Sequence, residues 1–249
     1  MKKLIAVILS LALFCLLIPA VAEEASPAGT WYLKAASKDG ADIQVVDPEG
    51  IVVKVNEDGT FAIIVGGVTR NGTWTREDSS VFTMALAEDD KTEFKLDGEE
   101  LVFELTGSIV RMSRTPGEKP EGPAAVAAES ADAFEGTWIP FAQLEYGLYE
   151  ELSEEGKAGY ATVQIGDGKV RSLFSNGEGG FSELAAYEAS VADGKLTFED
   201  SAFIPFKAVL TLLDDGTLLY ETTMFSDDGE SVTIGIIYVR EAAAEEPAA

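Results

Sequence analysis

Hydrophobic and polar positions alternate strictly in many short rows along the chain. Four such rows are Ile51, Val53 and Val55; Phe61, Ile63 and Val65; Phe82, Met84 and Leu86; and Leu101, Phe103 and Leu105. Because successive side chains of a strand point to opposite faces, this period of two predicts half-buried β-strands. Asp-Gly and Asn-Gly pairs separate the rows, and they tolerate the positive φ of tight hairpin turns. The pattern therefore predicts an antiparallel meander, which hides its edges by closing into a barrel.

This pattern runs through the chain twice. The tripeptide Gly-Thr-Trp at residues 29–31 recurs 107 residues later at residues 136–138. Each copy opens a series of alternating rows, and each series closes on an apolar strand that ends in an arginine, Arg114 or Arg240. Self-similarity over this distance indicates two similar units. We therefore expect an all-β fold of two antiparallel up-and-down meander barrels, with about eight strands each.

The remaining segments have compositions unlike those of the two units. Prolines interrupt the segment that joins the units and block regular pairing, and the C-terminal residues are Ala, Glu and Pro. The expected divisions are a signal peptide at residues 1–22, a first barrel at 29–114, a flexible linker at 115–133, a second barrel at 134–240 and a disordered tail at 241–249.

The first residues of the chain have the pattern of a secretory signal peptide. An apolar run from Leu4 to Ile18 follows two lysines and is too short for a good membrane span. Small residues follow, and we expect cleavage after Ala22. A lipoprotein signal at Cys15 is disfavoured because the bulky Phe14 precedes it. The protein is expected to be secreted or extracytoplasmic, with no membrane insertion once the signal is removed.

One stretch of the second unit breaks the alternation. Leu144, Leu148 and Leu152 recur every four residues between Gln143 and Gly156, and most of the other positions are polar. This spacing predicts an amphipathic helix of about three turns after the first strand of the unit. Such a helix would cover one barrel mouth, either as a core plug or as the roof of a pocket.

The opening Gly-x-Trp, the Asp-Gly hairpins and the final arginine resemble the lipocalin-like (calycin) barrels, and more narrowly the mostly uncharacterised lipocalin-like domains of exported bacterial proteins. The resemblance implies eight-stranded barrels, often with an internal cavity for an apolar small molecule. It also implies structural pairs at the closed end of each barrel, Trp31 with Arg114 and Trp138 with Arg240. Each unit is shorter than a full lipocalin, and a barrel of that size can be filled by its own side chains.

Composition restricts the possible chemistry. The chain has 44 Asp and Glu against 18 Lys and Arg, a formal net charge of −26 that repels nucleic acid and anionic lipid. It has no histidine, and the single cysteine, Cys15, lies in the predicted signal peptide, which excludes histidine- and cysteine-based catalysis and ordinary zinc sites. The carboxylates form no distinctive catalytic pair and no calcium-loop spacing. We therefore expect no enzyme, no cofactor and no metal.

Two classes of function fit these observations. In the first, the exported protein binds a small apolar or amphipathic ligand in its second barrel. The candidate lining residues are Leu144, Leu148, Leu152, Leu218, Tyr220, Met224, Ile234, Ile236 and Tyr238. In the second, filled barrels serve as a structural or interaction module whose partner is a protein of the cell envelope. An enclosed apolar cavity would favour the first class. The sequence does not indicate the oligomeric state.

Overall fold

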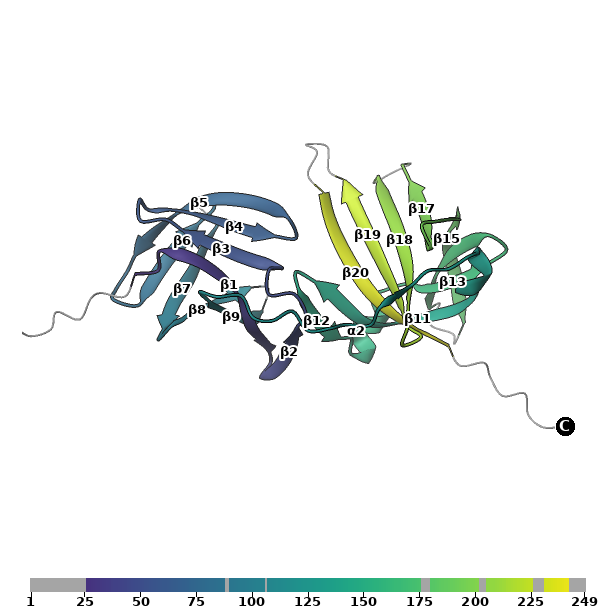
Figure 1. Cartoon of the computed structure of the whole chain (residues 1–249), viewed down its shortest axis with the longest axis horizontal. Coiled ribbons are helices and arrows are strands. Elements are labelled where there is room, and N and C mark those ends of the chain that lie inside the picture. The colour runs from purple at the N-terminus through teal and green to yellow at the C-terminus, as the bar shows by residue number, and fades with distance from the viewer. Residues whose placement is uncertain are drawn as a thin grey trace, which may run out of the picture.

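The computed structural model describes residues 26–87, 90–105, 107–175, 180–201, 205–225 and 231–241, and these form antiparallel β-strands almost throughout (Figure 1). The all-β prediction is confirmed. The predicted signal peptide and nearly all of the predicted tail lie outside the described residues. Within the described ranges, no helix is long and apolar enough to cross a membrane.

Eight strands of the first unit form a closed antiparallel barrel. They are β1 (Gly29–Lys38), β3 (Ile51–Val55), β4 (Thr60–Val65), β5 (Val68–Arg76), β6 (Val81–Ala85), β7 (Lys91–Asp97), β8 (Glu100–Leu105) and β9 (Ser108–Ser113). Each pairs with the next in this order. The last strand, β9, returns to β1, where Met112 lies opposite Leu33. The eight-stranded meander barrel is therefore confirmed here.

The alternating rows fill the interior of this barrel. Ile51, Val53 and Val55 of β3 are at most 3% exposed, whereas Lys54 between the last two is exposed. The inward residues of the other strands join them in one buried cluster that includes Trp31. The period of two in the sequence thus corresponds to an inner face of packed side chains and a more exposed outer face, on which Val52 is nevertheless buried.

The second unit forms another antiparallel sheet. Its strands are β10 (Ala125–Val126), β11 (Gly136–Glu145), β12 (Leu148–Glu151), β13 (Thr162–Gly166), β14 (Lys169–Ser175), β15 (Phe181–Glu188), β16 (Ser190–Ala192), β17 (Lys195–Asp200), β18 (Phe206–Leu213), β19 (Leu218–Phe225) and β20 (Ser231–Arg240). Pairing runs in the order β17, β18, β19, β20, β11, β13, β14, β15. After a break at Ala189, β16 continues the direction of β15 and pairs with β17.

The residues expected to form a helix from Gln143 to Gly156 instead form a hairpin over most of that length. β11 continues to Glu145, and Tyr146 and Gly147 make the turn with φ of 53° and 80°. A leucine at every fourth position fits alternate inward positions of a strand as well as a helix, so the spacing did not separate the two. A five-residue helix, α2 (Glu154–Ala158), follows the hairpin.

The segment between the units lies partly against the second sheet. Pairing begins only after Pro123, the last of its prolines, where β10 adds to the end of β18 with Ala125 opposite Leu213. A 3₁₀ helix, η1 (Ala131–Phe134), comes next and buries Phe134 completely in the core of the sheet. Nearly half of the predicted flexible linker, residues 125–133, is therefore held in place by backbone pairing and by the buried Phe134 ring that follows it.

Equivalent hairpins join the two units. β1 and β2 (Ala41–Val45) turn at Asp39-Gly40, and β11 and β12 turn at Tyr146-Gly147, the positions 107 residues later. β2 and β12 then pair with each other, with Val45 opposite Leu148. The first barrel and the second sheet consequently lie side by side, connected through these two short strands (Figure 1).

Candidate functional site at the barrel mouths

The end of the first barrel that carries Trp31 is closed by a tryptophan and an arginine. The Arg114 guanidinium carbon lies 4.1 Å from the centroid of the Trp31 ring, and the indole Nε1 donates to the Pro27 carbonyl at 2.7 Å. Arg114 also donates to the carbonyls of Ala28 and Ser26, at 2.6 and 2.7 Å. A cation over a ring face and three hydrogen bonds to backbone carbonyls hold the N-terminal segment across the end of the barrel.

The second unit repeats this arrangement at equivalent positions. The Arg240 guanidinium carbon lies 4.6 Å from the Trp138 ring centroid, and Trp138 Nε1 donates to the Phe134 carbonyl at 2.8 Å. Arg240 donates to the Ala133 carbonyl at 3.1 Å. The sequence pairs named for a structural role are thus brought together in both units. The described residues leave the opposite ends of the units, their mouths, as the places where a ligand could enter.

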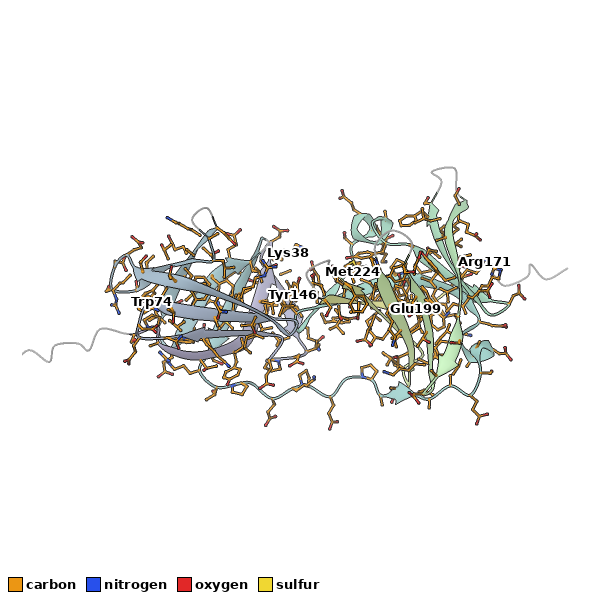
Figure 2. All side chains as sticks on the ribbon, turned by 90° about the horizontal axis from the view of Figure 1, so that it is seen from above. Lys38, Trp74, Tyr146, Arg171, Glu199 and Met224 are labelled. Carbon is orange, nitrogen blue, oxygen red and sulfur yellow. The ribbon has the colours of Figure 1, made fainter. Side chains whose placement is uncertain are left out.

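The mouth of the first barrel is plugged by the β11–β12 hairpin of the second unit. Tyr146 and Leu148 of that hairpin pack against the first barrel's core. The backbone N–H groups of Val46 and Asp47 both donate to the Gly147 carbonyl, at 2.8 and 3.1 Å. Figure 2 shows Tyr146 at the junction of the two units. Leu148 was expected to line the second barrel, but it packs against the core of the first.

The plug fits too closely for side chains at two glycines. A Cβ at Gly50 would overlap the Tyr146 carbonyl, and a Cβ at Gly147 would overlap the Asp47 carbonyl. Burial in this contact raises the pKa of Tyr146, and the nearby Glu145 carboxylate raises it further. The Tyr146 side chain therefore lies in the mouth as a neutral phenol.

The equivalent hairpin of the first unit makes no such contact in the described part of the chain. Asp39 and Gly40 at its tip are exposed, and a Cβ at Gly40 would have no atom within 4 Å. Nearby, Lys38 Nζ forms an ion pair with Glu150 at 3.0 Å, and Figure 2 places Lys38 beside the junction. Among the described residues, the second mouth thus lacks the plug that fills the first.

A column of aromatic rings runs through the interior of the second sheet. Tyr187 stacks on Phe198 at 4.9 Å and meets the edge of Phe206 at 5.5 Å. Phe198 stacks on Tyr220 at 6.1 Å, and Tyr220 meets Tyr238 edge to face at 5.9 Å. Phe198 and Tyr238 are buried, whereas the other three rings are half-buried. The column is therefore filled at its base and partly open above.

The phenols of this column differ in depth. Tyr238 is 2% exposed, and its hydroxyl donates to the Ala161 carbonyl at 3.1 Å. Burial raises the pKa of Tyr238 far above its usual value, and burial likewise raises the pKa of Tyr220. Tyr187, nearest the break between β15 and β16, also has a raised pKa for the same reason. All three are neutral hydroxyl groups at physiological pH.

The structure brings together about half of the lining residues expected from the sequence. Leu218, Tyr220, Ile234, Ile236 and Tyr238 share the core cluster of the second sheet. Met224 lies on the mouth side, in register between Phe206 and Val232. Leu144 packs beside Gly235, and Leu152 lies against Gly156 of α2, both outside that cluster.

Sequence reasoning missed three rings of the column, Tyr187, Phe198 and Phe206. Phe198 could have been found, because Leu196 and Phe198 alternate with polar residues and both are buried. Tyr187 stands at the end of a strand with a bulge, where Ser172 pairs with Ala185 but Leu173 pairs with Glu183. The shift breaks the period of two and hides the inward position from a sequence pattern.

Hollows on the described surface are open grooves. One of 1060 Å³ lies beside the first barrel and is lined in part by Leu33, Pro48 and Pro116. Another of 790 Å³ lies between the units, beside Ile43, Tyr149 and Tyr160. Among the described residues, no three acidic, cysteine or histidine side chains are grouped as metal ligands.

Comparisons with known proteins give little more. No family model and no curated protein matches the chain. One similar solved structure is a protein of unknown function from the DUF3598 family of Nostoc punctiforme, with 13% identity and a TM-score of 0.25. The match covers 87% of this chain and 96% of the other. At this identity and TM-score, the neighbour says nothing about what this chain binds.

Proposed function

We propose that this chain is an exported, non-enzymatic protein with two lipocalin-like barrels, the second of which binds a small apolar or amphipathic molecule at its mouth. In this proposal the second sheet is a partly open copy of the first barrel. The repeated Trp–Arg closure supports this, since Pro27 and Phe134 accept the same indole hydrogen bond at positions 107 residues apart. So does the matching order of strands.

The contrast between the two mouths carries the proposal. The first is covered by Tyr146 and Leu148 from the neighbouring unit, which leave a hollow of about 300 Å³ beside Leu105 and Val110. At the second, the described residues include half-buried Tyr187, Phe206 and Tyr220, whose rings belong to one column. Half-buried ring faces without a covering element are suited to an apolar ligand, because its binding removes them from water.

The rim of this mouth supports an amphipathic ligand. Phe225 and Val232, at the mouth ends of β19 and β20, are 46% and 39% exposed. Below them the Tyr220 hydroxyl is neutral and can donate or accept one hydrogen bond to a polar group of the ligand. Few polar groups in an apolar setting are the usual composition of a small-molecule site.

A second candidate function, a filled structural or interaction module, is favoured by the base of the column. Leu218, Ile236 and Tyr238 are 0, 5 and 2% exposed, so this part of the interior is packed like the first barrel. In that case the apolar rim would meet an envelope protein instead of a small molecule.

Binding of a neutral fluorescent naphthylamine by the full mature chain tests the proposal. Tyr187→Ala is expected to weaken binding about tenfold, since a lost ring contact corresponds to about 1.4 kcal/mol. Tyr32→Ala, a half-buried tyrosine of the first barrel, is the matched control and is expected to leave the dissociation constant unchanged. No saturable binding by the folded chain, or equal losses in both variants, would favour the filled module.

A further inference from the structure

One edge of β15 has no strand paired to it in the described structure, although β17 lies near its C-terminal end. β15 pairs with β14 along its whole length, from Ser175 opposite Phe181 to Lys169 opposite Glu188. Its continuation, β16, pairs with β17 over only three residues, and no described pairing joins β15 itself to β17. The described pairing with β17 therefore stops at Ser190 and does not continue along β15 toward the mouth.

The equivalent strand of the first barrel is continuous. β5 pairs with β4 as far as Thr73 and with β6 from Thr73 onward, so that no residue separates the two ladders. A Cβ at Gly72 would overlap the Ala85 carbonyl of β6, which shows how closely the strands approach. In both units, therefore, the residues before the change of partner pair on one side only, residues 68–72 in β5 and Phe181–Glu188 in β15, and the two strands differ mainly in the side chains that they expose.

The exposed side chains on the two strands also differ. On β5, the residues before the point where its pairing changes from β4 to β6 are mainly polar, with Thr69, Arg70 and Asn71 exposed. On β15, Phe181 is 52% and Leu184 is 71% exposed. Natural edge strands usually expose charged or polar side chains, as β15 does at Glu183 and Glu188, so the two exposed apolar side chains beside them indicate a surface that is covered by a partner.

The chain itself supplies a precedent for strand addition to this sheet. In the segment after Pro123, Ala125 and Val126 pair with Leu213 and Leu212 at the edge of β18. Two residues of linker are enough to make that addition. The backbone of this sheet therefore accepts extended segments that do not belong to the meander.

We propose that β15 accepts an extended polypeptide segment of a cationic partner protein as an added strand. Backbone hydrogen bonds to the free edge would hold the segment, as in other complexes formed by strand addition. Apolar side chains at alternate positions of the segment would cover Phe181 and Leu184. The site is distinct from the small-molecule mouth, because it uses main-chain groups and the outer apolar residues of one strand.

Charge identifies the partner as cationic. The chain carries a formal net charge of −26, which repels a second copy of itself and attracts basic proteins. The carboxylates of Glu183 and Glu188 on β15 are largely exposed. They meet Arg171 and Lys169 at 3.6 and 2.9 Å, and their remaining oxygen lone pairs face water and can accept from basic side chains.

The test uses short fluorescent peptides in which valine alternates with lysine, added to the full mature chain. We expect saturable binding by fluorescence anisotropy. An analogue with glutamate for lysine should bind at least about tenfold more weakly, and so should the lysine peptide N-methylated at alternate residues, which keeps its charge but cannot form the ladder. Equal binding of the N-methylated peptide would show charge attraction alone and overturn the proposal.

Substitutions on the protein locate the site. Phe181→Ser with Leu184→Ser should weaken the lysine peptide about tenfold. The control is Ile109→Ser, since Ile109 is 48% exposed on a strand paired at both edges, and it should change nothing. An unchanged affinity in the β15 variant would overturn the proposal. Because the naphthylamine probe reports the mouth separately through Tyr187, either proposal can fail while the other stands.

Discussion

The two units share a plan and differ in how completely it is closed. In the first, eight strands form a full circuit, and a neighbouring hairpin fills the mouth. In the second, the same closed end is built from Trp138 and Arg240, but half-buried rings line the interior above. The comparison shows that the second unit lends a hairpin to the mouth of the first, whereas no equivalent element fills the second mouth among the described residues.

The largest expected effect tests whether the closed ends are equivalent. Trp31 and Trp138 are each 1% exposed, so Trp31→Ala and Trp138→Ala should each cost about 3–5 kcal/mol of unfolding free energy. Urea denaturation followed by circular dichroism measures both. Trp74→Ala, at a half-buried ring of the first barrel, should cost less. A loss in only one of the two buried-tryptophan variants would contradict the equivalence.

The plug gives the next largest effect. Gly147→Ala should cost about 2–4 kcal/mol, because its Cβ would overlap the Asp47 backbone. Gly40→Ala is the matched control, since its φ of 81° nearly equals the 80° of Gly147 and its Cβ would meet nothing. The difference in unfolding free energy between the variants isolates the contact between the units. Equal costs would show that the hairpin does not fill the mouth.

A smaller difference is expected between the glycines that open the units. Gly29 and Gly136 have φ of 135° and 136°, so alanine is strained at both, by about 1–3 kcal/mol. Only at Gly29 would the Cβ overlap Arg114, because at Gly136 the nearest Arg240 atom is 3.8 Å away. Gly29→Ala should therefore lower the melting temperature more than Gly136→Ala. The reverse order would contradict the packing described for Arg114.

Alkaline pH should destabilise the second unit more than the first, without any mutation. Burial raises the pKa of Tyr187, Tyr220 and Tyr238, so the folded second unit holds their protons where the unfolded chain has lost them. Stability from these groups is fully present below about pH 10, the usual tyrosine pKa, and falls as pH rises above it. As pH rises, ultraviolet absorbance would follow the ionisation of the tyrosines, and hydrogen exchange would follow the unfolding of each unit. The strands of the first unit carry only Tyr32, so unfolding of the first unit at a lower pH than the second would contradict the prediction.

The smallest effect belongs to the ion pair at the junction. Lys38 and Glu150 keep 44% and 39% of their side chains exposed, so Lys38→Ala should cost about 0.2–1 kcal/mol. The cost should shrink in high salt. A loss above about 2 kcal/mol would show that charge, and not the Tyr146 plug, joins the units.

Much of the first barrel could be predicted from sequence, because its rows are simple. Ile51, Val53 and Val55 form an uninterrupted inward row, and Asp-Gly turns separate such rows. The plug could not be predicted. Tyr146 has a positive φ, which is uncommon for an aromatic residue, and its partners lie in the other unit. A sequence pattern records local period, whereas this contact depends on how two folded units meet.

The candidate site was predictable only where its strands are regular. Tyr220, Ile236 and Tyr238 were found because β19 and β20 alternate without interruption. Tyr187 was missed because a bulge at Leu184 shifts the register of β15 before it. The irregular strand that hid the site from the sequence is also one that pairs on one side only in the described structure.

Hydrogen exchange of the mature chain, resolved to single amides around the two equivalent hairpins, tests the contrast between the units most directly. The account predicts slow exchange at Val46 and Asp47, whose amides donate to the Gly147 carbonyl of the plug, and fast exchange at Gly40, at the exposed tip of the equivalent hairpin. Equally fast exchange at Val46, Asp47 and Gly40 would mean that the hairpin does not hold the first mouth, and would contradict the account.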